Sequence, residues 1–255
     1  MTNGAITGYI DVAQLALYGF WVFFIALIIY LRREDKREGY PLQNDNGRVK
    51  VQGFPAVPAP KAFRLADGRT VLAPDPAKDG GPIAAVPTAG GPGSPLEPTG
   101  DPMMDGVGPG AYALRANHPE RALDGGPLIV PLRNAPGFSV AAQDPDPRGM
   151  SAVGADGERG GTVTDLWVDR AEPMIRYLEV TLNDGTHTVL VPMPMARIDT
   201  YRNRVVVRSI LGSQFAAVPA IAAGDHITLA EEDRVTAYFG AGTLYAEASR
   251  AEPLL

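Results

Sequence analysis

Two carboxylates and an arginine lie close together in the segment TDLWVDRAEPMIRYLEV, residues 164–180. Asp169 and Glu172 follow one apolar run, and Arg176 opens the next. A strand-turn-strand path through this segment would bring the three side chains near one another. Two acids beside an arginine have unequal proton affinities when the cation favours ionisation while burial and mutual repulsion oppose it. The segment therefore suits acid–base chemistry, and the alternative is an ordinary turn with surface ion pairs.

The rest of the sequence contains no recognisable catalytic motif. It has no GxSxG, HExxH, P-loop or EF-hand pattern, and no GxGxxG that leads into a helix. With no cysteine, disulfides, zinc-thiolate sites, iron-sulfur clusters and thiol nucleophiles are excluded. The three histidines, His118, His187 and His226, have no metal-ligand spacing. A membrane-anchored hydrolase using Asp169 and Glu172 would lack a nucleophile and a metal, so we expect a non-catalytic protein.

The formal net charge of −6 lies entirely outside the first 38 residues. Four cationic and four anionic side chains cancel within residues 1–38, which leaves residues 39–255 acidic. An acidic water-facing part repels phosphate backbones, whereas nucleic-acid binding needs a basic surface. We therefore expect no nucleic-acid partner.

A membrane anchor is predicted near the N-terminus. Residues 12–31 (VAQLALYGFWVFFIALIIYL) contain no charge, and at about 1.5 Å per residue a helix of this length spans roughly 30 Å, the thickness of a bilayer core. A signal peptide is the alternative, but no basic region precedes the run and RRE follows it where a cleavage site would need small residues. The run also lacks histidine, so it offers no imidazole to a chlorophyll magnesium or a haem iron.

The orientation of this anchor follows from its flanking charges. Arg32, Arg33, Lys36 and Arg37 all follow the helix, and nothing basic precedes it. The positive-inside rule then places the bulk of the chain in the cytoplasm. We expect these four cations to lie at the lipid headgroups.

The water-facing part divides into an extended segment and a β-rich domain. Residues 41–100 contain 11 Pro and 9 Gly, which favours extended chain over helix. One hairpin is predicted there, in which Asp67-Gly68 turns between two short apolar-alternating strands. Residues 78–100 are expected to be a linker that is ordered only against a partner surface.

After residue 155 the pattern indicates five short strands, with Asn183-Asp184-Gly185 as a hairpin turn. A small barrel or curled sheet is the predicted arrangement. Glu231, Glu232 and Asp233 favour a helix N-terminus, and the helix is predicted to run to about Tyr238, ended by Gly240 and Gly242. The predicted strands are residues 162–168, 177–182, 188–191, 204–210 and 226–229.

Five motifs in the sequence carry a family resemblance. They are YLRREDKREGYPL (30–42), PTGDPMMDGVGP (98–109), DPDPRGM (144–150), GTVTDLWVDRAEPMIRYLEV (161–180) and EEDRVTAYFGAGTLYA (231–246). Together they resemble, nearly end to end, the H subunit of the photosynthetic reaction centre of purple bacteria. The resemblance implies one transmembrane α-helix plus a mainly β cytoplasmic domain that contains a small PRC-type barrel and a short C-terminal helix. The implied boundaries are a periplasmic 1–11, a helix at 12–31, an extended segment at 32–100 and a cytoplasmic domain at 101–255, with the barrel at about 155–240.

The resemblance also implies partners and a location. The chain would cap the pigment-binding L and M subunits in the bacterial inner (intracytoplasmic) membrane, near core antenna polypeptides, a cytochrome subunit and membrane lipids. Bacteriochlorophyll, bacteriopheophytin, quinones and non-haem iron would be held by partner subunits, and none by this chain. Its function would be to stabilise the assembly and to assist proton transfer to the secondary quinone. The alternative is a membrane-tethered PRC-barrel adaptor that binds another protein and has no link to photochemistry.

By the same resemblance, the proton-path carboxylates of the family fall on Asp169 and Glu172, with the nearby arginine on Arg176. Family members often have a histidine pair after an Asp-Gly near the surface. This sequence reads LDGGPLIV, so Asp124 is kept and the pair is absent. His118 lies six residues upstream and is a candidate substitute, and Glu232 is retained although His226 stands where some relatives have glutamate.

Overall fold

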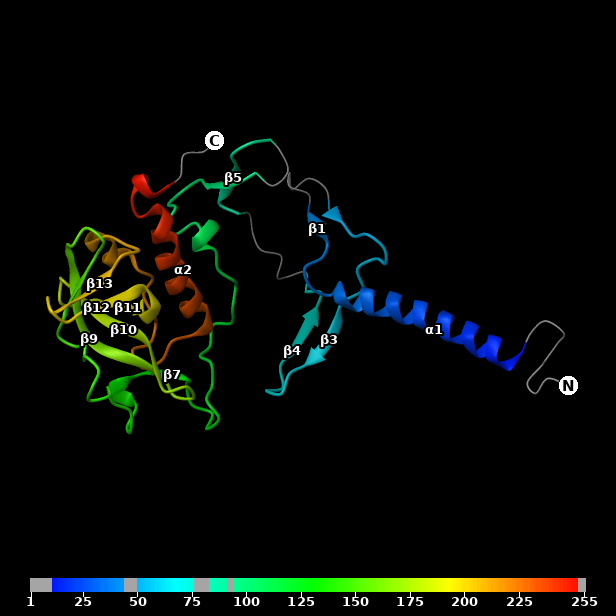
Figure 1. Cartoon of the computed structure of the whole chain (residues 1–255), viewed down its shortest axis with the longest axis horizontal. Coiled ribbons are helices and arrows are strands. Elements are labelled where there is room, and N and C mark those ends of the chain that lie inside the picture. The colour runs from blue at the N-terminus through cyan, green and yellow to red at the C-terminus, as the bar shows by residue number, and fades with distance from the viewer. Residues whose placement is uncertain (1–10, 44–49, 76–82, 91–93, 252–255) are drawn as a thin grey trace. The chain divides into compact units, whose positions relative to one another are not determined.

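The computed structural model describes residues 11–43, 50–75, 83–90 and 94–251. The chain divides into two compact units. Figure 1 colours the chain from blue at the N-terminus to red at the C-terminus. The first unit comprises Met1–Gly81 and Ala89–Ser94, and the second comprises Pro82–Thr88 and Pro95–Leu255. The first unit contains the long helix, and the second contains the large sheet.

Helix α1, Val12–Asp35, is the element that fits a membrane. Asp11 and Gln14 form a capping box, in which Asp11 Oδ1 accepts from Gln14 N at 2.8 Å and Gln14 Oε1 accepts from Asp11 N at 3.3 Å. None of its residues is buried, its mean hydropathy reaches 2.3, and it is the one candidate span among the described residues. An exposed apolar surface of this length is stable in lipid rather than water. The helix continues one turn beyond the predicted residue 31.

Lys36 ends α1 and is buried, with 2% of its surface exposed. Its Nζ donates to the carbonyl oxygens of Gln52 at 2.5 Å and Pro55 at 2.6 Å, and it lies 5.1 Å from the centre of the Tyr40 ring. A buried ammonium is tolerated only when its donors are paired, and here two main-chain oxygens and an aromatic face pair them. Lys36 therefore fixes residues 52–55 against the end of the helix.

Arg37 has a similar role. Its Nη1 donates to the carbonyl oxygens of Ala59 and Ala73, both at 3.0 Å, and its Nε pairs with Glu34 at 2.8 Å. The expectation that all four cations face lipid headgroups is therefore wrong for Lys36 and Arg37, because their donors bind carbonyl groups within the chain. Arg32 and Arg33 are exposed and remain suited to headgroups.

We predict that Lys36→Met loosens the segment that follows α1. The carbonyls of Gln52 and Pro55 lose their donor, at a cost of about 2 kcal/mol of local stability. Protease cleavage within residues 52–75 of the full chain in lipid vesicles should become at least about tenfold faster. Arg33→Met is the matched control, since Arg33 is exposed. Equal cleavage rates in the two variants would show that Lys36 does not hold this segment.

Short antiparallel ladders follow α1. The predicted hairpin is confirmed as β3 (Lys61–Arg64) and β4 (Thr70–Ala73), with Gly68 at φ +86° in its turn. The sequence predicted one hairpin, and the structure adds two further ladders. These are β1 (Leu42–Gln43) with β2 (Lys50–Val51), and β5 (Ala85–Pro87) with β6 (Leu96–Pro98). Other parts of the predicted 78–100 linker lie outside the described residues.

The second unit is built on a seven-stranded sheet in the order β11-β10-β9-β8-β13-β12, with β7 also paired to β9. All neighbours are antiparallel except β8 and β13, and among the described strands no ladder joins β11 to β12. The strands are β7 (Ile129–Pro131), β8 (Ser151–Val153), β9 (Arg159–Asp169), β10 (Met174–Leu182), β11 (Thr188–Pro192), β12 (Ala196–Asp199) and β13 (Arg204–Val207). Short 3-10 turns lie at Gly108–Gly110, Leu132–Asn134, Met193–Met195, Gly212–Ala217 and Ala248–Arg250.

Helix α2, Leu229–Tyr245, lies alongside this sheet and shares its core (Figure 1). Trp167 and Leu178 from the strands and Phe239 from the helix are fully buried in one cluster. Close approach is required at Gly160, where a Cβ atom would lie 2.3 Å from the Phe215 ring. The mainly β domain with a C-terminal helix is thus confirmed, and Asn183-Asp184-Gly185 forms the predicted turn, with Gly185 at φ +72°.

The C-terminal predictions need correction. Residues 226–229 form no strand, because Thr228 is the N-cap of α2 and exchanges hydrogen bonds with Glu231 at 2.8 Å and 3.2 Å. The helix also passes through Gly240 and Gly242 to Tyr245. A Cβ atom at either glycine would lie 2.4 Å from a main-chain oxygen of Pro109 or Ser209, so these glycines allow packing and do not end the helix. The strand predicted at 204–210 ends at Val207.

Candidate functional site

Asp169 is the last residue of β9 and organises the turn into β10. It is buried, with 6% exposed, and its Oδ1 accepts from the main-chain N–H groups of Ala171 at 2.9 Å and Glu172 at 3.0 Å. Met174 then pairs with Asp169 as β10 begins. The strand-turn-strand path predicted from the sequence is confirmed, and the Asp169 carboxylate fixes its conformation.

Glu172 and Arg176 occupy the same turn and the strand after it. Both are exposed. Among the described residues, no hydrogen bond or ion pair joins the side chains of Asp169, Glu172 and Arg176. Asp169 is therefore the buried member, and Glu172 is a carboxylate in contact with solvent on a turn that Asp169 holds in place.

Asp124 is connected to this turn by Arg170, a residue that the sequence reasoning did not select. The Arg170 guanidinium forms an ion pair with the Asp124 carboxylate and donates to the carbonyl oxygen of Pro127 at 3.1 Å. Asp124 Oδ1 also accepts from Gly126 N at 3.0 Å. The hydrogen bond from Arg170, with that from Gly126, lowers the pKa of Asp124, so Asp124 is held as a carboxylate. Arg170 directly follows Asp169 in the sequence, and this position could have indicated that it belongs to the site.

His118 lies at the N-terminus of α2. Its main-chain oxygen accepts from Leu229 N at 3.1 Å, and its ring Nδ1 lies 3.1 Å from the oxygen of Pro119. The neighbouring Asn117 Oδ1 accepts from Thr228 Oγ1 at 3.1 Å. In the part of the chain that the structure describes, no hydrogen bond joins His118 to Asp124. The main chain of His118 therefore lies at the first turn of α2, the turn that also contains Glu232.

Glu232 is a buried carboxylate, with 9% exposed, and it accepts a hydrogen bond from Tyr177 Oη at 3.1 Å. Burial raises the pKa of Glu232 above its ordinary value, although Tyr177 and the cations Arg176 and Arg115 favour the ionised form. Burial, together with the adjacent Glu232, also raises the pKa of Tyr177. Arg176 is thus electrostatically associated with Glu232, a relation that the spacing in the sequence did not indicate.

A pH-dependent stability follows for Glu232→Gln. The raised pKa makes the ionised carboxylate less favourable in the folded chain, so stability present below about pH 4.5 is lost as pH rises through the folded pKa. Glutamine keeps an acceptor for Tyr177 and cannot ionise. The variant should exceed wild type in urea midpoint at pH 8, and the difference should shrink towards pH 4. Glu158→Gln, at an exposed position, is the control. If the difference in urea midpoint between Glu232→Gln and wild type does not vary with pH, Glu232 does not ionise in a buried environment.

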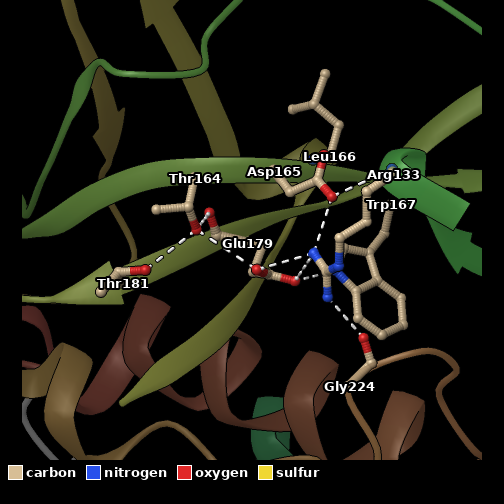
Figure 2. Close-up of polar contacts among 8 residues, drawn as sticks. All are labelled: Arg133, Thr164, Asp165, Leu166, Trp167, Glu179, Thr181 and Gly224. Atoms are coloured by element: carbon tan, nitrogen blue, oxygen red, sulfur yellow. Dashed lines mark hydrogen bonds and ion pairs between the residues drawn. The ribbon is translucent and has the colours of Figure 1, made fainter. Parts of the chain in front are cut away.

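A second polar cluster surrounds Arg133, which follows β7. Figure 2 shows its guanidinium between the carboxylates of Asp165 and Glu179. Arg133 Nη1 donates to Asp165 Oδ2 at 2.8 Å and to Glu179 Oε2 at 2.9 Å, while Nη2 donates to the oxygen of Gly224 at 2.6 Å. Trp167 Nε1 donates to Glu179 Oε2 at 2.9 Å. The cluster joins β7, β9, β10 and the loop before α2.

The two carboxylates face each other across β9 and β10, since Glu179 pairs with Asp165. Like charges at such positions repel, and Arg133 offsets this repulsion. Burial acts to lower the pKa of Arg133, but Glu179 and Asp165 outweigh burial and raise it. The cluster lines a surface cavity of about 440 Å³ together with Phe138. The sequence did not reveal it, because Arg133 lies 32 residues before Asp165.

The described residues contain no group of three or more His, Asp or Glu side chains placed to hold a metal ion. Two sets of titratable groups lie in this domain: the β9–β10 turn with Asp124, and Glu232 with Tyr177.

Comparison with known families identifies both parts of the chain. Residues 141–214 match the PRC-barrel domain, which defines the class of the β domain that begins with β8. Residues 4–134 match the N-terminal region of the photosynthetic reaction centre H chain, a match of 131 of the 255 residues. The chain therefore belongs to the family of photosynthetic reaction centre H chains. It is a membrane-associated subunit with one candidate transmembrane helix, as the resemblance implied.

Proposed function

We propose that this chain caps the cytoplasmic face of the L and M subunits of a photosynthetic reaction centre and stabilises their assembly. The observation that supports this best is the H-chain match over residues 4–134, which includes α1 and the chain that follows it. No residue of α1 is buried, and its apolar surface is suited to lipid and to neighbouring helices. In this proposal the N-terminus is periplasmic and the β domain is cytoplasmic, in the bacterial inner membrane.

The chain assists proton transfer to the secondary quinone. Glu172 is exposed to water on a turn that the buried Asp169 holds, and Arg170 brings Asp124 to the same turn. Carboxylates at such a turn can take protons from solvent and pass them on over hydrogen-bond distances. Arg176 and Glu232 extend this set of titratable and charged groups towards the interior, where burial raises the pKa of Glu232. The main chain of His118 lies at the N-terminus of the helix that carries Glu232.

The pigments and redox centres belong to the partners. Bacteriochlorophyll, bacteriopheophytin, quinones and the non-haem iron are held by L and M, and the apolar run 12–31 has no histidine to ligate a magnesium or iron. Core antenna polypeptides, a cytochrome subunit and membrane lipids surround the complex. The chain is non-catalytic and contributes shielding, assembly and proton access.

Removal of this chain from the purified complex tests the proposal. We expect the depleted complex to reduce its primary acceptor after one flash but to take up protons more slowly after a second flash, as measured with a pH-indicator dye. Added back, the full chain should restore the uptake. Unchanged second-flash uptake without the chain would contradict the proposed function.

A further inference from the structure

A basic surface stands out on this acidic chain, at the hairpin of β12 and β13. Residues 196–208 contain four arginines and one aspartate, a local charge of +3 in a chain whose net charge is −6. The arginines are Arg197, Arg202, Arg204 and Arg208. Charges interact over about 8 Å at physiological salt, so a partner close to this hairpin meets the local charge rather than the net one.

The register of the hairpin places Arg197 and Arg204 on one face. Arg197 pairs with Val206, and Asp199 pairs with Arg204, while Val205 and Val207 point to the opposite face and are fully buried. Arg202 lies in the turn of the hairpin, and Arg208 directly follows β13 and lines the same surface hollows as Arg197. The inner face thus belongs to the core, and the outer face presents a row of guanidinium groups.

Most of this positive charge is not neutralised within the chain. Asp199 forms its ion pair with Arg204 at 3.2 Å. The guanidinium groups of Arg197, Arg202 and Arg208 are exposed, and none has an ion pair with another described residue. The one aspartate of the hairpin, Asp199, also interacts with Arg202. Because four arginines share this single anion, the excess positive charges repel one another, and an anionic partner would relieve an existing cost as well as add attraction.

The surface is also hollowed and extended. A cavity of about 400 Å³ lies against Tyr201, Arg202 and Arg204, and a second of about 390 Å³ lies towards Arg250. The two share Arg197, Val206 and Arg208. β12 is at the end of the sheet order, so among the described strands its outer edge has no neighbour. Such an edge can pair with an added extended strand.

We propose that the outer face of the β12–β13 hairpin is a docking surface for an acidic, extended segment of a partner protein. Unpaired arginines supply recognition of carboxylates, the free edge of β12 supplies main-chain hydrogen bonds, and the two joined hollows accommodate side chains. Tyr201 is 95% exposed at the tip of the hairpin. Arginine and tyrosine are the residue types that dominate binding at protein interfaces, which favours a protein partner over a free anion or a lipid.

The test uses the full complex in mild detergent and a fluorescent octaglutamate peptide, with anisotropy as the readout. We expect saturable binding that weakens with salt and becomes at least tenfold weaker in Arg197→Glu/Arg208→Glu. Arg197→Gln/Arg208→Gln should weaken it less, and Tyr201→Ala should weaken it without changing its salt dependence. Arg234→Glu, another exposed arginine without an ion pair to described residues, should bind as wild type.

Two competing ligands distinguish the sources of negative charge. Inorganic phosphate at equal charge and detergent micelles that contain one third anionic lipid should displace the peptide poorly. Displacement by either ligand as efficient as by unlabelled peptide would overturn the protein-segment assignment in favour of phosphate or lipid. Absent binding, or equal binding by wild type and both double variants, would overturn the docking surface itself. These outcomes do not depend on the proton-transfer function.

Discussion

Glu172→Gln is expected to slow the proton-coupled second electron transfer to the quinone at least about tenfold, which corresponds to about 1.4 kcal/mol of barrier. Glutamine keeps the shape of the side chain and the turn that Asp169 holds through the Glu172 N–H group. It cannot accept and release a proton, so an exposed relay group is lost. The first electron transfer, which requires no full protonation, should change much less. Two-flash absorption on purified complexes across pH 6 to 9 measures both steps.

The control for this variant is Glu158→Gln, which removes another exposed carboxylate from the β domain at a turn before β9. Asp169→Asn and Asp124→Asn extend the series, because Arg170 links the loop of Asp124 to the turn of Asp169. A second-flash rate of Glu172→Gln within twofold of wild type at every pH would show that this turn has only a structural role.

Arg133→Met should destabilise the β domain by about 2 kcal/mol. Removal of the guanidinium leaves Asp165 and Glu179 facing each other without a cation, and it leaves the Gly224 oxygen without its donor. Loss of one partner from a fully buried charge pair costs about 3–5 kcal/mol, and the 45% exposure of the Arg133 side chain reduces this through solvent screening. Urea unfolding of the full chain in detergent, followed by fluorescence of the buried Trp167, measures the loss.

A second substitution separates charge repulsion from packing. Glu179→Gln in the Arg133→Met background removes one of the two facing anions, so it should recover part of the lost stability. In the wild-type background the same change weakens the pair with Arg133 and should destabilise. If Glu179→Gln destabilises both backgrounds equally, the carboxylates are not coupled through Arg133. Arg234→Met controls for loss of an exposed arginine.

Local sequence patterns predicted much of the fold. The uncharged run became α1, and the Asp67-Gly68 and Asn183-Asp184-Gly185 turns became hairpins because each favours its own turn geometry. Where the sequence predictions were wrong, tertiary packing determined the structure. Gly240 and Gly242 would break an isolated helix, but in α2 they allow main-chain atoms to approach where a Cβ would clash. The buried position of Lys36 likewise depends on carbonyl groups 16 and 19 residues away.

The sequence indicated only those residues of the candidate site that lie close together along the chain. Asp169, Glu172 and their turn are close in the sequence, so their spacing was informative. The partner of Asp124 is Arg170, 46 residues later, and the partner of Glu232 is Tyr177, 55 residues earlier. Contacts over such separations depend on sheet order and register, which a single sequence does not specify.

Isolation of the complex shows whether this chain is the H subunit of a photosynthetic reaction centre. The chain, tagged at its C-terminus, would be purified from its native membrane in mild detergent, and a near-infrared absorption spectrum recorded across the elution. We expect bacteriochlorophyll bands that co-elute with the chain together with two larger membrane subunits. A colourless preparation of the intact chain from a pigmented membrane would contradict it.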